Sequence, residues 1–209
     1  MKRSDPASAR RSAAIERIGA AIGEHGYAIE SDFLSDAATA ALYREARRRD
    51  AAMRFHPAAV GRAGARAERS DVRGDRIAWL DECAPVEAEQ ALWRALAELR
   101  LTLNRDLFLG LFSFEGHYAI YPPSAFYRRH LDRFRDDDAR VVSCALYLNE
   151  GWSESDGGAL RLHLEQGARD IVPVGGTMAC FLAERIEHEV LPATRERYAV
   201  TGWFRRLVC

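Results

Sequence analysis

Residues 141–182 read VVSCALYLNEGWSESDGGALRLHLEQGARDIVPVGGTMACFL, and this stretch decides the fold class. Four short apolar runs alternate here with glycine and proline turns. We expect strands over residues 141–148, 159–164, 170–174 and 177–182. Several short strands joined by tight turns predict a β-sandwich or barrel.

Two flanking segments, 109–121 and 198–208, also have the composition of strands. Before residue 106 the apolar side chains recur at helical spacing instead. Ile15, Ile18 and Ile22 predict a first helix that ends near Gly26. Asp36 is expected to cap a second helix, which continues to Arg49. A third helix is predicted by leucines spaced at i, i+4, i+7 and i+11: Leu92, Leu96, Leu99 and Leu103.

These patterns predict one α+β domain over residues 1–209. Residues 1–105 would form a mainly helical support, and residues 106–209 would form the β core. Between the second and third helices, residues 56–76 are rich in alanine, glycine and arginine. We expect a mobile loop there.

Composition and charge exclude several classes of protein. The 209 residues include 30 basic and 31 acidic side chains, and the formal net charge of -1 argues against a general nucleic-acid binder. No run of about 18 apolar residues predicts a membrane span, and the charged N-terminus lacks the apolar stretch of a signal peptide. The cysteines show no C-x-x-C spacing, so we expect core thiols in a reducing cytoplasm.

The chemistry centres on Tyr127-Arg-Arg-His130-Leu-Asp132. On a strand, His130 and Asp132 stand at i and i+2, so both side chains would point to one face. His188 follows 58 residues downstream, and Arg197 lies nine residues beyond it. Two histidines and one carboxylate on one face of a metal leave positions open, as in non-haem Fe(II) oxygenases. An arginine nearby could bind a carboxylate of a chelating acid through two hydrogen bonds.

Residues 121–204 resemble the Fe(II)/2-oxoglutarate dioxygenases of the prolyl-hydroxylase branch. Upstream, Arg73-Gly-Asp75-x-Ile77-x-Trp79 is similar to the mobile-loop segment of the oxygen-sensing prolyl hydroxylases and their bacterial relatives. The remaining matches are, in order, Tyr121-Pro122, Tyr127-x-x-His130-x-Asp132, Arg140, Tyr147-Leu-Asn149, Gly157-Gly158-x-Leu160-Arg161, His188-Glu-Val-x-Pro192 and Arg197-Tyr-Ala-Val-Thr201-x-Trp203.

The resemblance implies a double-stranded β-helix (jelly-roll) core and a set of site roles. It implies that Fe(II) is bound by His130, Asp132 and His188. Arg197 would bind the C5 carboxylate of 2-oxoglutarate, and O2 would be the second cosubstrate. Hydrogen bonds to 2-oxoglutarate are implied for Tyr147, Tyr121 and Thr201. A place in the substrate site is implied for Ile77, Trp79, Tyr127, Arg140, Trp203 and Asp75. Asp75 would link the loop to the body through an arginine such as Arg140.

The implied activity is hydroxylation of a prolyl residue in a protein, with release of succinate and CO2 and with ascorbate as a reductant. A protein of the translation machinery would be a plausible target. Two alternatives stay open: a free amino acid or other small molecule as substrate, and a non-catalytic jelly-roll binding module. Tyr147, Trp79 and Trp203 also fit a packing role. We expect His117 and His163 to be hydrogen-bonded or exposed, and not metal ligands.

Overall fold

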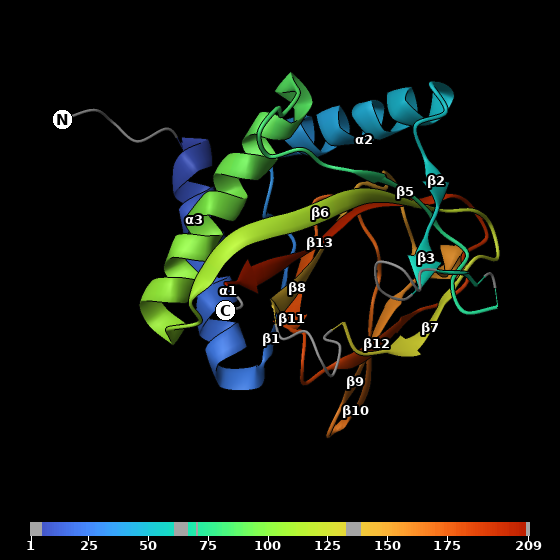
Figure 1. Ribbon diagram of the computed structural model, residues 1–209. Coiled ribbons are helices and arrows are strands. Elements are labelled where there is room, and N and C mark those ends of the chain that lie inside the picture. The colour runs from blue at the N-terminus through green and yellow to red at the C-terminus, as the bar shows by residue number, and fades with distance from the viewer. Residues whose placement is uncertain (1–5, 61–66, 70, 133–138, 208–209) are drawn as a thin grey trace.

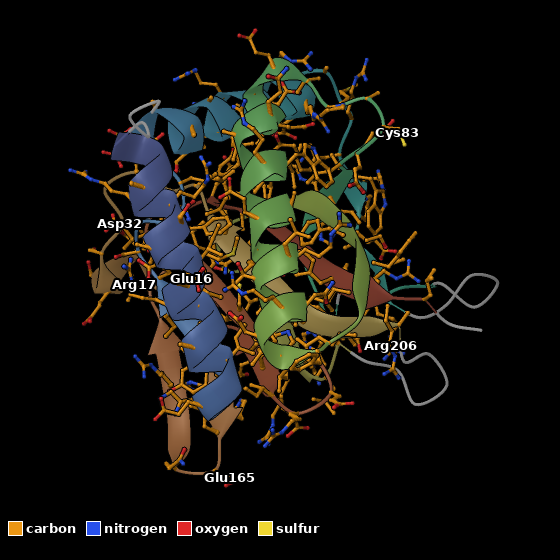
Figure 2. The ribbon with its side chains drawn as sticks, turned by 90° about the vertical axis from the view of Figure 1, so that its left-hand side faces the viewer. Glu16, Arg17, Asp32, Cys83, Glu165 and Arg206 are labelled. Atoms are coloured by element: carbon orange, nitrogen blue, oxygen red, sulfur yellow. The ribbon has the colours of Figure 1, made fainter. Side chains whose placement is uncertain are left out.

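In the described part of the computed structural model the α-helices are α1 (Pro6–His25), α2 (Asp36–Ala51) and α3 (Gln90–Leu107), as the sequence predicts (Figure 1). Two short 3-10 helices, η1 (Glu87–Glu89) and η2 (Glu154–Asp156), complete the helical elements described. The structure describes residues 6–60, 67–69, 71–132 and 139–207. All four leucines of the predicted α3 stripe are buried. Figure 2 shows α1 and α3 side by side in front of the sheet. Arg11 on α1 pairs with Glu98 on α3 at 2.7 Å.

The N-cap of α2 is Ser35, and the expectation that Asp36 caps this helix is wrong. The Ser35 hydroxyl accepts a hydrogen bond from the Ala38 backbone N–H at 3.3 Å. Asp36 is the first helical residue, where its negative charge interacts favourably with the positive end of the helix dipole. At the end of α1, Gly26 takes a positive φ of 79°, which allows the chain to turn directly into a strand.

Two antiparallel sheets face each other and form the jelly roll that the sequence predicts. The larger sheet has the strand order β1-β11-β8-β13-β6-β5-β2, and the smaller has the order β10-β9-β12-β7. The short strands β3 and β4 pair only with each other. The bounds are β1 (Tyr27–Glu30), β2 (His56–Pro57), β3 (Ala59–Val60), β4 (Ala67–Glu68), β5 (Arg76–Trp79), β6 (Leu111–Tyr121), β7 (Tyr127–His130), β8 (Arg140–Tyr147), β9 (Leu160–Leu164), β10 (Gly167–Ile171), β11 (Met178–Leu182), β12 (Glu187–Val190) and β13 (Arg197–Arg206).

Alternation along the central strands divides the core into two layers. On β8, Cys144 and Leu146 face the helices, whereas Ala145 and Tyr147 face the smaller sheet. This is the period-2 pattern of a strand that is buried on both faces. The Cys144 and Cys180 side chains are buried core residues as expected, and their free thiols lie 3.4 Å apart across β8 and β11. The side chains between the two sheets line the cavity described below.

Several strand boundaries differ from the sequence expectation. The run at 170–174 is shifted, because β10 forms a hairpin with β9 and ends at Ile171. The expected strand at 198–208 is β13, which begins at Arg197 and ends at Arg206; residue 208 of that expectation lies outside the described residues. The edge strand β1 was not predicted; pairing with β11 stabilises it. The 56–76 segment contains the short strands β2, β3 and β4, and its residues 61–66 and 70 lie outside the described part.

Within the described part of the chain, no helix combines the length and the apolar composition needed to cross a bilayer.

Candidate functional site

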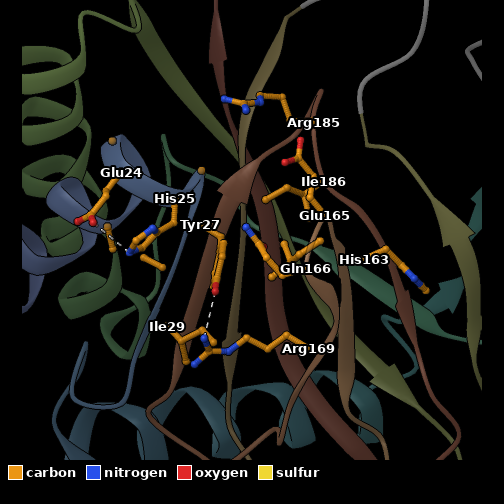
Figure 3. Close-up of a pocket in the computed structure, with 15 residues that line it drawn as sticks. Glu24, His25, Tyr27, Ile29, His163, Glu165, Gln166, Arg169, Arg185 and Ile186 are labelled. Atoms are coloured by element: carbon orange, nitrogen blue, oxygen red, sulfur yellow. Dashed lines mark hydrogen bonds and ion pairs between the residues drawn. The ribbon is translucent and has the colours of Figure 1, made fainter.

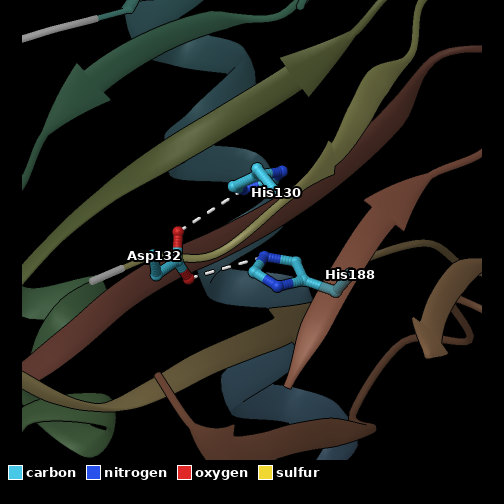
Figure 4. A group of neighbouring side chains, drawn as sticks. All are labelled: His130, Asp132 and His188. Carbon is cyan, nitrogen blue, oxygen red and sulfur yellow. Dashed lines mark ion pairs between the residues drawn. The ribbon is translucent and has the colours of Figure 1, made fainter. Parts of the chain in front are cut away.

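Three side chains that the sequence singled out meet between the sheets (Figure 4). His130 ends β7 and pairs in register with His188 on the neighbouring strand β12. The His130 Nε2 atom lies 3.5 Å from Asp132 Oδ1, and the His188 Nε2 atom lies 3.5 Å from Asp132 Oδ2. One ligand atom from each residue lies within 4.8 Å of the other two. Among the described residues this is the one such group able to hold a metal ion.

Backbone carbonyls orient both imidazoles. The His130 Nδ1 atom lies 2.7 Å from the Arg128 carbonyl oxygen, and the His188 Nδ1 atom lies 3.3 Å from that of Ile186. A carbonyl can only accept, so each Nδ1 carries a proton, and in the neutral ring Nε2 is then the atom with the lone pair that a metal needs. The buried Nε2 of His130 has no hydrogen-bond partner among the described residues. A metal ion between these donors would satisfy it, so the donor set fits Fe(II).

Asp132 is not on the strand, contrary to the sequence expectation. The strand β7 ends at His130, and Asp132 lies in the bend that follows. The Ser143 hydroxyl on β8 donates to the Asp132 Oδ2 atom at 2.7 Å and so fixes the buried carboxylate. Burial by itself would raise the pKa of Asp132, but the neighbouring histidines and the Ser143 hydroxyl hold it well below its usual value.

Ser143 was missed by the sequence analysis. It stands on β8 two and four residues before Ala145 and Tyr147, so all three side chains share one face of the strand. That spacing from Tyr147 is the signal that could have found it.

Arg197 is a buried cation with no carboxylate partner among the described residues. Its side chain is 2% exposed and lines the same cavity as the three ligand candidates. The Nε atom donates to the Gly158 carbonyl oxygen at 2.8 Å. The guanidinium carbon lies 5.1 Å from the Tyr121 ring and 5.0 Å from the Tyr147 ring. Burying a charge is costly unless it is paired, so this position is suited to an anionic ligand.

The surroundings of Arg197 leave room and hydrogen-bonding groups for such a ligand. Gly158 takes a positive φ of 69°, and a Cβ atom there would lie 3.2 Å from the Arg197 Cδ atom. The Tyr147 hydroxyl is buried without a hydrogen-bond partner in the described residues. Burial raises the pKa of Tyr147 to about 12, so the hydroxyl keeps its proton and can donate. Thr201 lines the same cavity.

A cavity of about 260 Å³ contains the site, and aromatic side chains form its wall. Ile77 and Trp79 reach it from β5, and Trp203 reaches it from β13. Tyr127 lines it next to His130, with the two rings stacked. The Arg140 guanidinium carbon lies 3.4 Å from the Trp203 ring centroid. The structure therefore brings Ile77, Trp79, Tyr127, Arg140 and Trp203 to one cavity, whereas Asp75 does not line it.

The expected link between Asp75 and Arg140 is not the one that the structure shows. Asp75 pairs with Arg73 at 2.5 Å, whereas Arg140 pairs with Glu115 at 2.9 Å. Arg73 and Asp75 lie only two residues apart, so this pair is local in the sequence.

His117 also lines the cavity, and the expectation that it is hydrogen-bonded or exposed is wrong. It is 2% exposed, and its Nδ1 atom has no partner among the described residues. The ring packs 5.0 Å from Trp79 and 5.6 Å from Trp203. The alternation along β6 points it inward beside Ala119, a signal that the sequence contains. His163, by contrast, is hydrogen-bonded as expected, to Glu189 at 3.0 Å.

Burial of His117 predicts a pH dependence of stability. Desolvation lowers its pKa to about 3 in the folded protein, against an ordinary value of about 6.5. The unfolded chain therefore binds the extra proton first as the pH falls, and stability present above about pH 6.5 is lost towards pH 3. The slope is at most about 1.4 kcal/mol per pH unit for this group. Urea unfolding of metal-free protein between pH 7 and 4 measures it.

The matched variant is His117→Met, which removes the titrating group and keeps an apolar side chain of similar size. Its stability should fall less than that of the wild type over the same pH range. The exposed His25→Met variant serves as the control and should follow the wild type. Parallel profiles for the wild type and His117→Met would contradict the prediction.

A second cavity, of about 650 Å³, lies between the end of α1, β1 and the β9–β10 hairpin (Figure 3). Arg169 crosses it and donates to the Tyr27 hydroxyl at 3.0 Å. Its lining mixes acidic and basic side chains, and the described residues there include no group arranged to hold a metal. We therefore assign the chemistry to the cavity that contains His130, Asp132 and His188.

Comparisons with known proteins agree with this geometry. The family model for the 2OG-Fe(II) oxygenase superfamily matches residues 116–205. A crystal structure of a Pseudomonas putida prolyl-4-hydroxylase is 47% identical in sequence, and the match covers 93% of this chain and 100% of that chain with a TM-score of 0.85. This chain belongs to the 2OG-Fe(II) oxygenase superfamily.

Two further relatives place this oxygenase close to prolyl hydroxylases. A Trichoplax adhaerens prolyl hydroxylase, solved in complex with a peptide of the hypoxia-inducible factor oxygen degradation domain, is 26% identical, covers 95% of this chain and 91% of its own, and has a TM-score of 0.84. Human Egl nine homolog 1 is 30% identical over 91% of this chain. The chain spans 46% of the length of that human relative.

Proposed function

We propose that this protein is an Fe(II)- and 2-oxoglutarate-dependent dioxygenase that hydroxylates a prolyl residue in a protein and releases succinate and CO2. One observation carries the proposal: a metal-ligand group of two histidines and one aspartate shares a cavity with a buried arginine that lacks a carboxylate partner in the described residues. Bound iron would supply the oxidation of a C–H bond by O2.

The protein side chains hold and orient the reactants. His130, Asp132 and His188 bind the iron, and the Arg128, Ile186 and Ser143 groups described above keep their donor atoms aimed inward. Arg197 binds the far carboxylate of 2-oxoglutarate bidentately. Further hydrogen bonds to this cosubstrate come from Tyr147, Tyr121 and Thr201.

The substrate enters beside the aromatic wall. Ile77, Trp79, Tyr127, Arg140 and Trp203 contact it, and the 56–76 loop closes over it and excludes water. Similarity to a prolyl hydroxylase solved with a peptide supports a peptide segment as the substrate. A protein of the cytoplasm, such as one of the translation machinery, is the proposed target, since free thiols suit a reducing compartment.

Quantitative mass spectrometry tests this substrate class. Proteins from cells with the wild-type gene are compared with those from cells that carry the Arg197→Met variant. We expect a mass gain of one oxygen on a specific proline in the wild-type cells alone. No hydroxyproline difference, together with 2-oxoglutarate turnover by the purified enzyme that free amino acids stimulate, would favour a small-molecule substrate instead.

A further inference from the structure

Residues 72–74, near the C-terminal end of the 56–76 loop, are hydrogen-bonded to the chain at β7, the strand that carries His130. We call these residues the loop root. Arg73 forms an antiparallel bridge with Tyr127. The Gly74 N–H donates to the Phe126 carbonyl at 2.9 Å, and the Arg128 N–H donates to the Val72 carbonyl at 2.9 Å. Directly after this segment, β5 joins the larger sheet through β6. The loop root therefore connects both sheets at the metal site.

The Arg73 side chain is held in one orientation. Its Nε and Nη2 atoms donate to the two Asp75 carboxylate oxygens at 2.7 and 2.5 Å. The side chains of both residues are largely withdrawn from solvent, at 12% and 0% exposure. The Arg73 guanidinium carbon lies 4.3 Å from the centroid of the Tyr127 ring. The ion pair with Asp75 thus holds the planar Arg73 guanidinium over the face of the Tyr127 ring, in a cation–π contact.

Because its position is fixed by Arg73, Tyr127 in turn restricts the orientation of His130. Its ring stacks on His130 with centroids 3.7 Å apart and an angle of 19° between the planes. In the plane of the imidazole, the Nδ1 hydrogen bond to the Arg128 carbonyl sets the direction of Nε2. The stacked ring blocks movement out of that plane. Two contacts therefore fix the His130 ring: the hydrogen bond to the Arg128 carbonyl and the stack on Tyr127. Arg128 and Tyr127 both lie on β7, the strand to which the loop root is hydrogen-bonded.

We propose that Arg73 is a positioning residue for the metal centre: paired with Asp75, it holds Tyr127 against His130 and keeps the His130 Nε2 atom aimed at the iron. This inference rests on the proposed function, because the ion that His130 binds is taken to be iron. It assigns to Tyr127 a role in metal binding in addition to its proposed substrate contact. It also makes the loop root, and not only the closing loop, part of the site.

The test measures metal affinity and needs no substrate. Mn(II) is titrated into metal-free protein, and free Mn(II) is followed by electron paramagnetic resonance. Groups that orient a ligand affect metal affinity by roughly 10- to 100-fold, so we expect Arg73→Met to raise the Mn(II) Kd by about 10-fold or more. Tyr127→Leu should have a similar effect. Tyr127→Phe should keep the affinity near the wild-type value, because the stacked ring remains.

A double variant and a matched control sharpen the result. If both residues act through one stack, Arg73→Met combined with Tyr127→Leu should bind Mn(II) about as well as Tyr127→Leu alone. Arg69→Met removes an exposed arginine of the same loop that pairs with Asp71, and it should leave the Kd unchanged. The visible charge-transfer band of the anaerobic Fe(II) and 2-oxoglutarate complex gives a second readout. Arg73→Met and Tyr127→Leu should shift it, whereas Tyr127→Phe should not.

Three outcomes separate the possibilities. If Arg73→Met lowers the melting temperature of the metal-free protein but leaves the Mn(II) Kd and the band unchanged, Arg73 is only structural and the proposal is overturned. If Arg73→Met does not fold, Arg73→Lys, which keeps the charge but lacks the planar fork, together with the two Tyr127 variants decides the question. If the wild type binds Mn(II) no better than His188→Ala does, the proposed function fails, and this inference fails with it.

Discussion

The His188→Ala variant should release no succinate above background when it is incubated with Fe(II), ascorbate and 2-oxoglutarate. Among the described residues, His188 is one of three side chains whose ligand atoms converge in the cavity, and its Nε2 atom lies 3.5 Å from the Asp132 carboxylate. Removing it leaves two ligands, which do not hold the ion in the geometry that the reaction requires. The reaction contains the substrate that the proteomic comparison identifies. Succinate is then measured by chromatography.

His163→Ala is the matched control for this variant. His163 lies on the adjacent strand β9, in register with Glu187, and it pairs with Glu189 away from the metal-ligand candidates. Its loss should leave turnover close to that of the wild type. Turnover that survives His188→Ala unchanged would overturn the oxygenase assignment of this cavity.

The Arg197→Met variant should raise the KM for 2-oxoglutarate by about 150-fold, which corresponds to about 3 kcal/mol. Losing one partner of a buried, hydrogen-bonded charge pair typically costs about 2–5 kcal/mol, and Arg197 is 2% exposed. Methionine keeps most of the side-chain volume and removes the charge. Titration of 2-oxoglutarate at saturating Fe(II), with succinate as the readout, measures the change.

Arg197→Met should weaken binding of 2-oxoglutarate but increase the stability of the protein when no ligand is bound. Arg197 is buried and has no carboxylate partner in the described residues, so removing its charge should raise the stability of the metal-free protein by about 1 kcal/mol. Arg185→Met, which changes an exposed arginine without a described ion pair, is the control for both measurements. An unchanged KM in Arg197→Met, with stability reduced, would mean that Arg197 is a structural residue and not the carboxylate site.

Much of the fold could be predicted because its signals are local. The leucine stripe of α3 and the glycine and proline turns between the strands of residues 141–182 each report on neighbours within a few positions. The edge strand β1 was missed because it exists through pairing with β11, which lies far along the chain. The strand β10 was misplaced for a different reason: its hairpin with the neighbouring strand β9 sets where it begins and ends, and the apolar run at 170–174 does not.

The candidate site divides in the same way. Ordered motifs with specific spacing pointed to His130, Asp132, His188 and Arg197 before any geometry was known. Ser143 escaped because its spacing from Tyr147 gives only its face of the strand, whereas its role depends on the bend that brings Asp132 to it. The assumption that Asp132 continues the strand of His130 was wrong for the related reason that β7 ends at the first ligand candidate.

The sequence by itself determined the class of fold, the identity of the ligand candidates and the one arginine suited to a carboxylate. Only the tertiary structure decided which side chains support them. It pairs Asp75 with Arg73 and not with Arg140, stacks Tyr127 on His130, and turns His117 into the cavity between Trp79 and Trp203. Spacing along the chain specifies residue types and faces, whereas the register of strands far apart in sequence sets which faces meet and which polar atoms are left without partners.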